Sequence, residues 1–336
     1  MVLRSFFIAL LLPAALFAQA QPLPPGPNMT DAQGRKQGAW SKNWASGKVR
    51  YEGQFKDDRP IGTFRHYDEE GRLSTIQRHA GDGHVSRAEH VHPNGTSMAI
   101  GKYVDQQKDS TWNYYDDAGA LRKIERFKMG KLHGEVASYY ADGKLAEQDH
   151  FQDGMLDGES MSWFPSGSPK STATYTGGEG QGKMVFYFPG GKKEIEGQVV
   201  NGDREGTWYY FNEDGTVQLQ VLYAKGVVVK ERKENGTFTE YYDDDQIKSE
   251  MTYKKGMREG PFAEYRADGK WVVRELPTDP IKGTPGDMER VVQGQTKKIE
   301  GGYNNDLLEG DVMEYDEKGK LVKTTRYVAG EVAGTK

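Results

Sequence analysis

Hydrophobic and polar residues follow a short pattern that recurs along most of the chain. The segment GTWYYFNEDG at 206–215 has a run of aromatic residues followed by a polar turn that ends in glycine. Nearly the same pattern, STWNYYDDAG, occurs at 110–119. Aromatic residues favour a pleated, half-buried strand, and a glycine with positive φ commonly closes a hairpin turn. Each copy therefore predicts a β-strand followed by a tight turn.

The pattern returns at a period of about 24 residues, which identifies a repeat protein. With Gly206 as position 0, earlier repeats begin without a gap at Gly182, Gly158, Gly134, Ser110, Ser86, Gly62 and Gly38. Later repeats begin at Gly236, Gly260, Gly286 and Gly310. About twelve repeats are therefore expected between residues 38 and 333.

Within a repeat, aromatic residues recur at position 5 and at position 17. After the turn the residues alternate, as in Val49, Tyr51, Gly53 and Phe55, which predicts a second strand. A hairpin of this size is not stable alone, so neighbouring repeats are expected to stack. The predicted fold is all-β, an elongated and twisted ribbon of about twelve stacked hairpins.

Positions 2 and 5 have opposite parity along the first strand of a repeat. A regular strand would place Trp208 and Phe211 on opposite faces, and a β-bulge would realign them. Both arrangements fit the sequence. In either case we expect the two rings to stack on their equivalents in neighbouring repeats.

Extra residues interrupt the period at two places. KERKEN at 230–235 is predicted to lengthen the hairpin around the exposed valines at 227–229. LPTDPIKGTP at 276–285 contains three prolines and is predicted to loop out. Functional residues are best sought where the repeat is broken, at 86–92, 227–235 and 276–285.

The N-terminus has the pattern of a secretory signal peptide. Arg4 precedes an apolar run at 6–17, and Ala18-Gln19-Ala20 follows as a small-x-small cleavage site. Residues 1–20 are therefore predicted to be removed by cleavage after Ala20. The apolar run is short for a membrane span, and no later segment approaches its length.

The remaining domain boundaries follow from composition. Residues 21–37 contain four prolines and little to bury, which predicts an extended linker. The repeat array then covers 38–333, and 334–336 form a short tail. We expect the mature chain to be secreted or periplasmic without a transmembrane segment, and its membrane association stays open. The chain has no cysteine, which excludes disulfides, thiolate metal sites and a lipoprotein anchor.

Overall composition predicts a folded chain with a thin core. Hydrophobic residues make up 35% of the sequence, but it contains 19 Tyr, 13 Phe and 6 Trp, and disordered chains are poor in aromatics. The formal charge of -5 is spread over 45 basic and 50 acidic residues. No basic block is long enough to bind nucleic acid, so we expect no nucleic-acid partner.

The consensus of the repeats carries a family resemblance. GTWYYFNEDGTVQLQVLYAKG and GEVASYYADGKLAEQDHFQDGMLDG at 134–158 resemble the bacterial variant of the MORN repeat, whose proteins are often grouped as YwqK-like antitoxin-family proteins. The resemblance covers most of the mature chain. It departs at Ser86, Asp245, Pro169, Pro277 and the two insertions. It implies a β-hairpin ribbon with a role in binding or scaffolding, and no catalytic residue is carried over.

Histidines are the most suggestive candidate metal ligands. Five of the seven, His66, His79, His84, His90 and His92, fall in the second and third repeats. His66 and His90 occupy the same position in successive repeats, which places them two strands or about 10 Å apart. His90 and His92 share a strand face, but no second pair faces them. We expect surface or packing histidines and no metal site.

Other chemical motifs are absent from the sequence. Acidic turns such as YDDAG at 115–119 and DDD at 243–245 lack the D-x-D-x-D-G spacing of calcium loops, and are predicted to be solvated hairpin turns. No G-x-S-x-G, H-E-x-x-H or phosphate-binding glycine motif occurs. We therefore predict no cofactor and no enzymatic activity.

Two classes of function fit these observations. The first is an exported scaffold that binds a protein partner at the cell envelope, with a neutralising partner of a secreted toxin as a narrower version. The second is a surface protein that binds a glycan or the cell wall through aromatic stacking. In both, the candidate binding surface consists of Trp112, Trp163, Trp208, Tyr115, Tyr139, Tyr187 and Tyr241.

Overall fold

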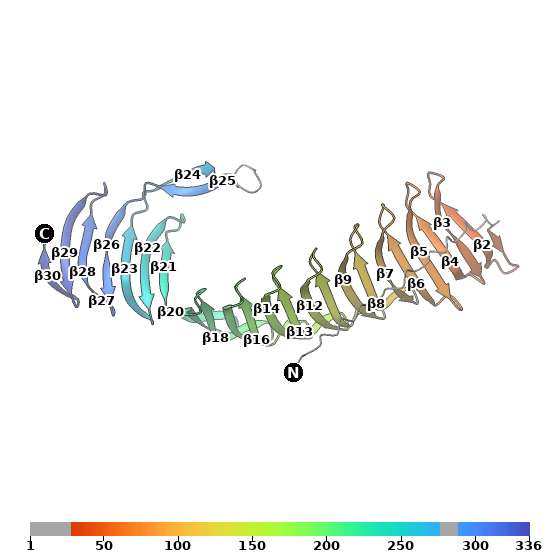
Figure 1. Cartoon of the computed structure of the whole chain (residues 1–336), viewed down its shortest axis with the longest axis horizontal. Coiled ribbons are helices and arrows are strands. Elements are labelled where there is room, and N and C mark those ends of the chain that lie inside the picture. The colour runs from red at the N-terminus through yellow and green to blue at the C-terminus, as the bar shows by residue number, and fades with distance from the viewer. Residues whose placement is uncertain (1–27, 276–287) are drawn as a thin grey trace, which may run out of the picture. The chain divides into compact units, whose positions relative to one another are not determined.

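A computed structural model describes residues 28–275 and 288–336, which form strands and turns (Figure 1). None of these residues forms a helix that could cross a membrane. The predicted signal peptide, residues 21–27 of the predicted linker and the predicted loop at 276–285 lie outside the described residues. The chain divides into two compact units, an N-terminal unit of residues 1–131 and a C-terminal unit of residues 132–336.

In the N-terminal unit each strand pairs antiparallel with the next. The strands are β1 (Met29–Thr30), β2 (Lys36–Asn43), β3 (Val49–Lys56), β4 (Arg59–Tyr67), β5 (Leu73–Ala80), β6 (Val85–Val91), β7 (Ser97–Val104), β8 (Gln107–Tyr115) and β9 (Leu121–Lys128). The short strand β10 (Lys131–Leu132) falls at the boundary of the two units. Four of the predicted repeats, β2–β3, β4–β5, β6–β7 and β8–β9, are thus antiparallel hairpins.

The C-terminal unit contains two series of hairpins and one separate hairpin. The first series is β11 (Gly134–Tyr139), β12 (Leu145–Gln152), β13 (Met155–Trp163), β14 (Pro169–Thr176), β15 (Glu179–Gly180), β16 (Gly182–Tyr187), β17 (Lys193–Val200), β18 (Asp203–Phe211), β19 (Val217–Ala224) and β20 (Val227–Lys233). The second is β21 (Gly236–Tyr241), β22 (Ile247–Lys254), β23 (Met257–Tyr265), β26 (Lys297–Asn304), β27 (Leu307–Leu308), β28 (Gly310–Tyr315), β29 (Leu321–Val328) and β30 (Glu331–Thr335). The separate hairpin is β24 (Lys270–Glu275) and β25 (Met288–Gln293). The prediction of an all-β fold of consecutive hairpins is confirmed.

The register within a hairpin shows which face each aromatic residue occupies. Gly206 pairs with Tyr223, and a register shift falls between Tyr210 and Phe211. The shift leaves an extra residue in the second strand, so the first strand keeps its alternation. Accordingly the Trp208 ring contacts Tyr223, with centroids 6.1 Å apart, and Phe211 contacts Tyr209 at 6.4 Å. Both faces therefore carry aromatic residues.

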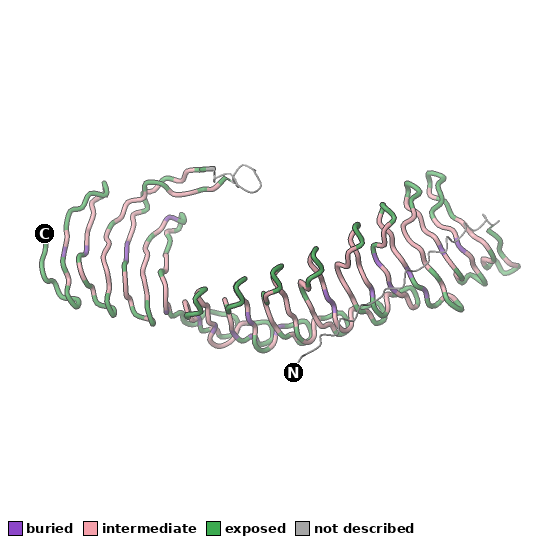
Figure 2. The backbone as a smooth tube through the Cα atoms, in the orientation of Figure 1, coloured by how far each residue is buried: buried purple, intermediate pink, exposed green. Residues whose placement is uncertain are grey.

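The main part of the core is a row of side chains at position 2 on one face of the hairpins, and Ala137, Val185 and Ala263 at position 3 are buried on the opposite face. Trp112 and Trp208 are its largest members and are 0% and 1% exposed. Each packs over a glycine at position 15 of the preceding hairpin, Gly101 below Trp112 and Gly197 below Trp208. Figure 2 shows the buried residues as short segments within strands that are otherwise half-buried or exposed. The expected stacking of Trp208 on its equivalents is replaced by contact between positions 2 and 17.

The insertion at 230–235 forms a new strand instead of a longer hairpin. β20 pairs with β19, whereas the following β21 pairs with β22. The extra residues supply a second copy of the first strand of the repeat, so β20 ends one series and β21 begins the next. Glu234 and Asn235 join them, because both backbone amides donate to the Gln218 carbonyl, and the Glu234 carbonyl accepts from Gly256. The prediction of a lengthened hairpin was wrong.

The first strand of the predicted repeat at Gly260 and the second strand of the next predicted repeat form one hairpin, β23 with β26. Gly260 pairs with Tyr303 in β26, which is the pairing of position 0 with position 17 seen elsewhere. The Arg266 amide donates to the Thr296 carbonyl at 2.9 Å, so the β24–β25 hairpin is inserted where other repeats have a short turn. The described residues thus contain eleven repeat hairpins and one inserted hairpin instead of about twelve consecutive repeats.

Both ends of the predicted array extend further than expected. Met29 pairs with Gln37, so the described end of the predicted linker, residues 28–37, contributes to the sheet. The Trp40 indole donates to the Met29 carbonyl at 3.1 Å and fixes this short strand. At the other end Thr335 pairs with Thr325, so Gly334 and Thr335 of the predicted tail belong to β30.

Two serines at position 0 provide a matched pair of substitutions. Ser110 has a φ of 62°, in the region that glycine occupies at this position in other repeats and that costs other residues about 1–2 kcal/mol. Ser110→Gly is expected to stabilise the protein by about 0.5–1 kcal/mol, after the flexibility of glycine is deducted.

Ser86 is buried, lacks a positive φ and accepts a hydrogen bond from Gln77 at 2.8 Å. Ser86→Gly is expected to destabilise by about 1 kcal/mol. Urea denaturation measures the free energy of unfolding of both variants. If both substitutions stabilised or both destabilised the protein, the different roles given to Ser110 and Ser86 would be contradicted.

Candidate functional site

The predicted binding residues are divided between the two faces of the hairpins. Trp112 and Trp208 are fully buried in the row at position 2, so their side chains are not available to a ligand. Their inclusion in a binding surface was wrong, because parity alone does not tell which face is the core. The Trp112 indole donates to the Lys102 carbonyl at 3.1 Å and the Trp208 indole to the Gln198 carbonyl at 3.0 Å, which satisfies their only polar atom.

The other predicted residues occupy position 5 on the opposite face. Tyr115, Tyr139, Trp163 and Tyr187 are half-buried, and Tyr241 is 59% exposed. In the C-terminal unit, Tyr139, Trp163 and Tyr187 lie on β11, β13 and β16. We call these three residues the position-5 row. Its rings remain partly accessible to a partner.

The surroundings of position 5 differ along the chain. The Tyr67 hydroxyl donates to Glu52 at 2.8 Å, and burial together with this carboxylate raises the pKa of Tyr67 to about 12. Tyr265 has the same contact with Glu250 at 2.7 Å. The residue equivalent to Glu52 is Gln148 in the hairpin before Trp163 and Thr172 in the hairpin before Tyr187. Neither of these two residues carries a carboxylate.

Position 3 lies on the same face as position 5. Its residues also become less polar from the N-terminal unit to the first hairpins of the C-terminal unit. In the N-terminal unit it holds Arg65, Glu89 and Asn113, whereas in the first hairpins of the C-terminal unit it holds Ala137, Met161 and Val185. The position-5 row is therefore flanked by apolar residues in β11, β13 and β16. The sequence analysis missed position 3, although its change from charged to apolar residues is visible in the repeat alignment.

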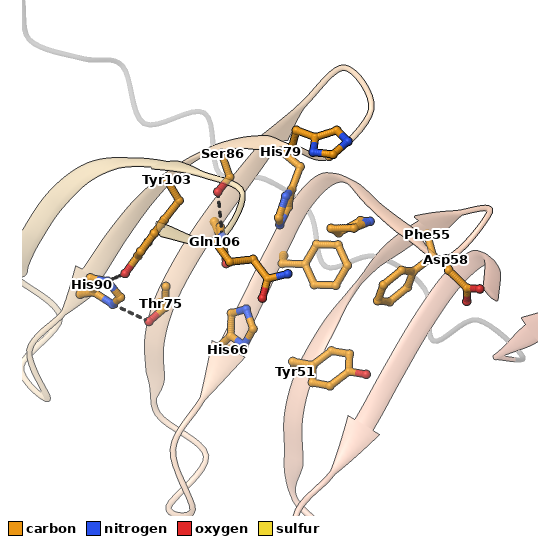
Figure 3. A pocket seen from close by; sticks show the side chains of 15 residues that line it. Tyr51, Phe55, Asp58, His66, Thr75, His79, Ser86, His90, Tyr103 and Gln106 are labelled. Atoms are coloured by element: carbon orange, nitrogen blue, oxygen red, sulfur yellow. Dashed lines mark hydrogen bonds between the residues drawn. The ribbon is translucent and has the colours of Figure 1, made fainter. Parts of the chain in front are cut away.

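A second candidate site is a recess of about 710 Å³ in the N-terminal unit. Tyr51, Phe55 and Phe64 line it with aromatic rings, and four histidines are among the other lining residues (Figure 3). We call it the histidine recess, after His66, His79, His84 and His90. The ring centroids of Phe55 and Phe64 are 5.1 Å apart in an edge-on contact, and His79 contacts the edge of Phe64 at 5.2 Å.

The recess lies where the repeat is broken. Between Phe64 on β4 and Trp112 on β8, position 2 holds only the methyl group of Ala88 on β6. The strand pairing of β5 with β6 runs through Ser86 without a register shift, unlike the pairing of β3 with β4. Because no large ring covers the sheet between Phe64 and Trp112, the side chains at positions 4, 13 and 17 remain accessible.

Hydrogen bonds hold several polar groups of the recess in place. His90 is bonded through Nδ1 to the Thr75 hydroxyl at 3.0 Å and through Nε2 to the Tyr103 hydroxyl at 3.4 Å. Gln77 donates to Ser86, and Figure 3 shows Gln106 reaching over the recess. The Nδ1 atom of His79 is buried without a hydrogen-bond partner. A buried polar atom of this kind is uncommon and costly.

The histidines of the recess differ in their affinity for protons. Burial lowers the pKa of His66, His79 and His90 below the usual value, and Lys108 adds to this at His90. At the rim, hydrogen bonding to Asp105 and the nearby charge of Asp82 raise the pKa of His84. These three half-buried rings are therefore predominantly neutral near pH 7.

The five clustered histidines of the sequence do not form one group. His92 lies apart from the recess and its Nε2 contacts the Tyr115 carbonyl at 3.0 Å. Within the described parts of the chain, no three His, Asp or Glu side chains are arranged to hold a metal ion. The sequence analysis identified 86–92 as a break in the repeat, but it missed the contributions of Tyr51, Phe55 and Phe64 from earlier hairpins.

The neutral histidines predict a pH-dependent stability of the N-terminal unit. A lowered folded pKa means that the unfolded chain binds protons more tightly, so stability falls as pH drops through about 6.5. His66 faces His79, His90 and Arg50, and His90 faces Lys108, which reinforces this direction. The exposed His84 has a raised pKa and acts in the opposite sense, because its stabilisation is lost as pH rises. We expect the urea concentration at the midpoint of unfolding to be lower at pH 5.5 than at pH 7.5.

His79→Phe provides the control for this expectation. Phenylalanine occupies the same position in Phe55 and Phe127, so the variant keeps a ring there and removes one titrating group. Its midpoint should change less between the two pH values than that of the unmodified chain. An equal or larger change would contradict a contribution from His79.

Comparisons with known proteins bear on the repeats. Residues 36–57, 132–153, 204–225 and 234–255 match the family described as MORN repeat variant. These segments coincide with the hairpins β2–β3, β11–β12, β18–β19 and β21–β22. A search of curated proteins found no significant match.

Similarity to solved structures is weak. The Tc holotoxin pore of Photorhabdus luminescens is 11% identical, covering 88% of this chain and 18% of the toxin chain, with a TM-score of 0.15. The TcdB2-TccC3-Cdc42 structure is 9% identical, covering 87% and 24%, with a TM-score of 0.13. A porin-like protein from Bacteroides uniformis is 6% identical, covering 76% and 96%, with a TM-score of 0.15.

The chain thus spans only 18% and 24% of the matched chains in the first two of these structures. Superpositions this poor carry no information about its fold or activity. The match to the repeat family is independent of them and agrees with the hairpin register. The protein therefore carries MORN repeat variants at the four matched segments, each of which is a hairpin of its sheets.

Proposed function

We propose that this protein is a non-enzymatic scaffold, exported to the cell envelope, that binds a protein partner through the position-5 row of the C-terminal unit. The observation that carries the proposal is the combination of half-buried Tyr139, Trp163 and Tyr187 with apolar neighbours at position 3 on the same strands. Tyrosine and tryptophan are enriched at protein interfaces, where they bury a large area at a small entropic cost.

Geometry supports a partner that spans several repeats. Successive position-5 residues are separated by two strands, or about 10 Å, so an interface of ordinary size would include all three rings. The strands of Trp163 and Tyr187 are paired on both sides. β13 pairs with β12 and β14, and β16 pairs with β14 and β17. A rigid surface of this kind loses little conformational entropy on binding.

The resemblance to YwqK-like antitoxin proteins suggests a narrower form of this proposal. In that form the partner is a secreted toxin and binding neutralises it. Export follows from the signal-peptide pattern at 1–20. Glycan binding through Trp112 and Trp208 is not proposed, because both side chains are buried.

The test compares partner capture by matched variants. The mature chain is immobilised and incubated with an envelope extract, and bound proteins are identified by mass spectrometry. Trp163→Ala with Tyr187→Ala should weaken the binding of a specific partner at least tenfold, in line with the loss of about 1.4 kcal/mol or more from two aromatic contacts. Tyr265→Ala, at the same position but beside Glu250, is the control and should retain binding.

Two results would overturn the proposal. One is a specific partner that binds the double variant as well as the unmodified chain. The other is the absence of any partner whose capture depends on the position-5 row. A partner that inhibits growth when produced alone would favour the antitoxin form.

A further inference from the structure

The histidine recess has the dimensions of a small-molecule site. Its volume of about 710 Å³ lies within the range of about 300–1,000 Å³ typical of ligand pockets. Residues from three successive hairpins line it, from Tyr51 on β3 to Tyr103 on β7. It is therefore formed by the sheet itself and does not depend on a single turn.

Its lining carries little charge. Among the described residues that line it, Asp58 is the only carboxylate and there is no lysine or arginine. His84 at the rim is engaged by Asp105 and Asp82. Phosphate, sulfate or carboxylate ligands are bound by arginine, lysine or backbone amides, and cations by several carboxylates. The recess therefore suits an uncharged ligand.

The polar atoms of the recess can both donate and accept hydrogen bonds. A neutral histidine has one donor and one acceptor nitrogen, and the hydroxyl and amide groups of Thr75, Ser86 and Gln77 also have both. A ligand hydroxyl has the same dual character and can complement any of them. His79 lines the recess with a ring of the same kind.

Aromatic rings provide the apolar part of the surface. Tyr51 and Phe55 are half-buried, so part of each ring faces the recess. The two faces of a pyranose ring carry C–H groups that pack on aromatic side chains, while its hydroxyls point outward to polar partners. Aromatic and neutral hydrogen-bonding groups are adjacent in this recess and match both parts of such a ring.

We infer that the histidine recess binds an uncharged, hydroxyl-rich ring of the size of one hexose, either free or at the end of a glycan. This inference does not rest on the proposed protein partner, because the recess and the position-5 row belong to different units. Protonation of His66, His79 and His90 would place charge beside the rings, so binding is expected to be weaker at pH 5.5 than at pH 7.5.

Isothermal titration of the mature chain tests the inference. The probes are methyl glucoside, methyl galactoside, methyl mannoside and N-acetylglucosamine, followed by an array of neutral oligosaccharides. Saturable binding of at least one probe or array glycan is expected. An array signal much stronger than any monosaccharide titration would identify a glycan end as the ligand, and equal affinities would identify the free sugar.

Two variants locate the site. His79→Phe retains the ring found at this position in Phe55 and Phe127, but removes the polar nitrogens of a lining residue, and should weaken binding at least tenfold. Gln77→Gly with Ala88→Phe recreates the glycine and ring pair of Gly53 and Phe64, fills the recess and should abolish binding. His92→Phe, outside the recess, is the control and should change affinity less than twofold.

Thermal melts of all variants separate loss of the site from loss of the fold. The inference is overturned if no neutral sugar binds at millimolar concentration, or if binding persists in folded His79→Phe and in the filled variant. A preference for sugar phosphates or for peptides over neutral sugars would also overturn it. Loss of the protein partner in the position-5 variants would leave sugar binding unchanged, so the two proposals fail independently.

Discussion

Gly101→Ala is expected to destabilise the N-terminal unit by about 3 kcal/mol or more, because the added methyl group would overlap a buried ring. A Cβ at Gly101 would lie 2.1 Å from the nearest atom of the Trp112 indole. The expected result is a large fall in the urea midpoint, measured by far-UV circular dichroism. Near-UV bands of the buried tryptophan should be lost at lower denaturant than in the unmodified chain.

The Trp112 ring has little freedom to move away. Its indole donates to the Lys102 carbonyl, Tyr103 contacts it edge-on at 4.9 Å, and the Lys108 ammonium lies 4.8 Å from the ring centroid. Movement of the ring would break these contacts together. The strain must therefore be relieved by the strands, at the expense of their pairing.

Gly190→Ala is the matched control for this substitution. A Cβ at Gly190 would have no atom within 4 Å, and the residue lacks a positive φ. This variant should change the free energy of unfolding by less than about 0.5 kcal/mol, as is usual for surface positions. Equal effects at Gly101 and Gly190 would show that close packing over glycine is not what stabilises the hairpins.

Trp112→Ala is expected to cost about 3–5 kcal/mol, the range for removal of a fully buried large aromatic side chain. Trp112 forms a cluster with Ala88 and Ala99, and the smaller residue would leave a cavity there. Trp163→Ala should cost about 1 kcal/mol, because Trp163 is only half-buried on the other face. Urea denaturation followed by circular dichroism measures both variants.

A double-mutant cycle joins the two predictions. In the Trp112→Ala background, Gly101→Ala should be nearly neutral, because the ring that the methyl group would overlap is gone. The coupling energy should then be about 3 kcal/mol or more, the whole cost of Gly101→Ala in the unmodified chain. Additive effects would contradict direct packing of Trp112 over Gly101.

Local structure could be predicted from the sequence because it depends on contacts close in the chain. Each turn closes within a few residues, as where the Gly215 amide donates to the Asn212 carbonyl at 2.8 Å, and the alternation of the strands follows from their own residues. The period and the hairpins were therefore correct. The sequence did not predict the pairing of β23 with β26. Gly260 and Tyr303 lie far apart in sequence, and an alternating pattern does not specify which strand pairs with which.

The candidate sites show the same division. The sequence identified the aromatic residues at position 5 and the break at 86–92. It could not distinguish buried Trp112 and Trp208 from half-buried Trp163, because alternation separates two faces without telling which of them packs against glycine. The recess was missed as a whole, since its aromatic and histidine residues come from different hairpins.

By itself, the sequence determined that the chain is a series of β-hairpins, because strand and turn preferences act within each repeat. Only the tertiary structure decided how the strands pair around each interruption, which face holds the large core side chains, and that Ala88 leaves a recess lined by histidines. Those features depend on how side chains of neighbouring hairpins fill space. Single repeats do not contain that information.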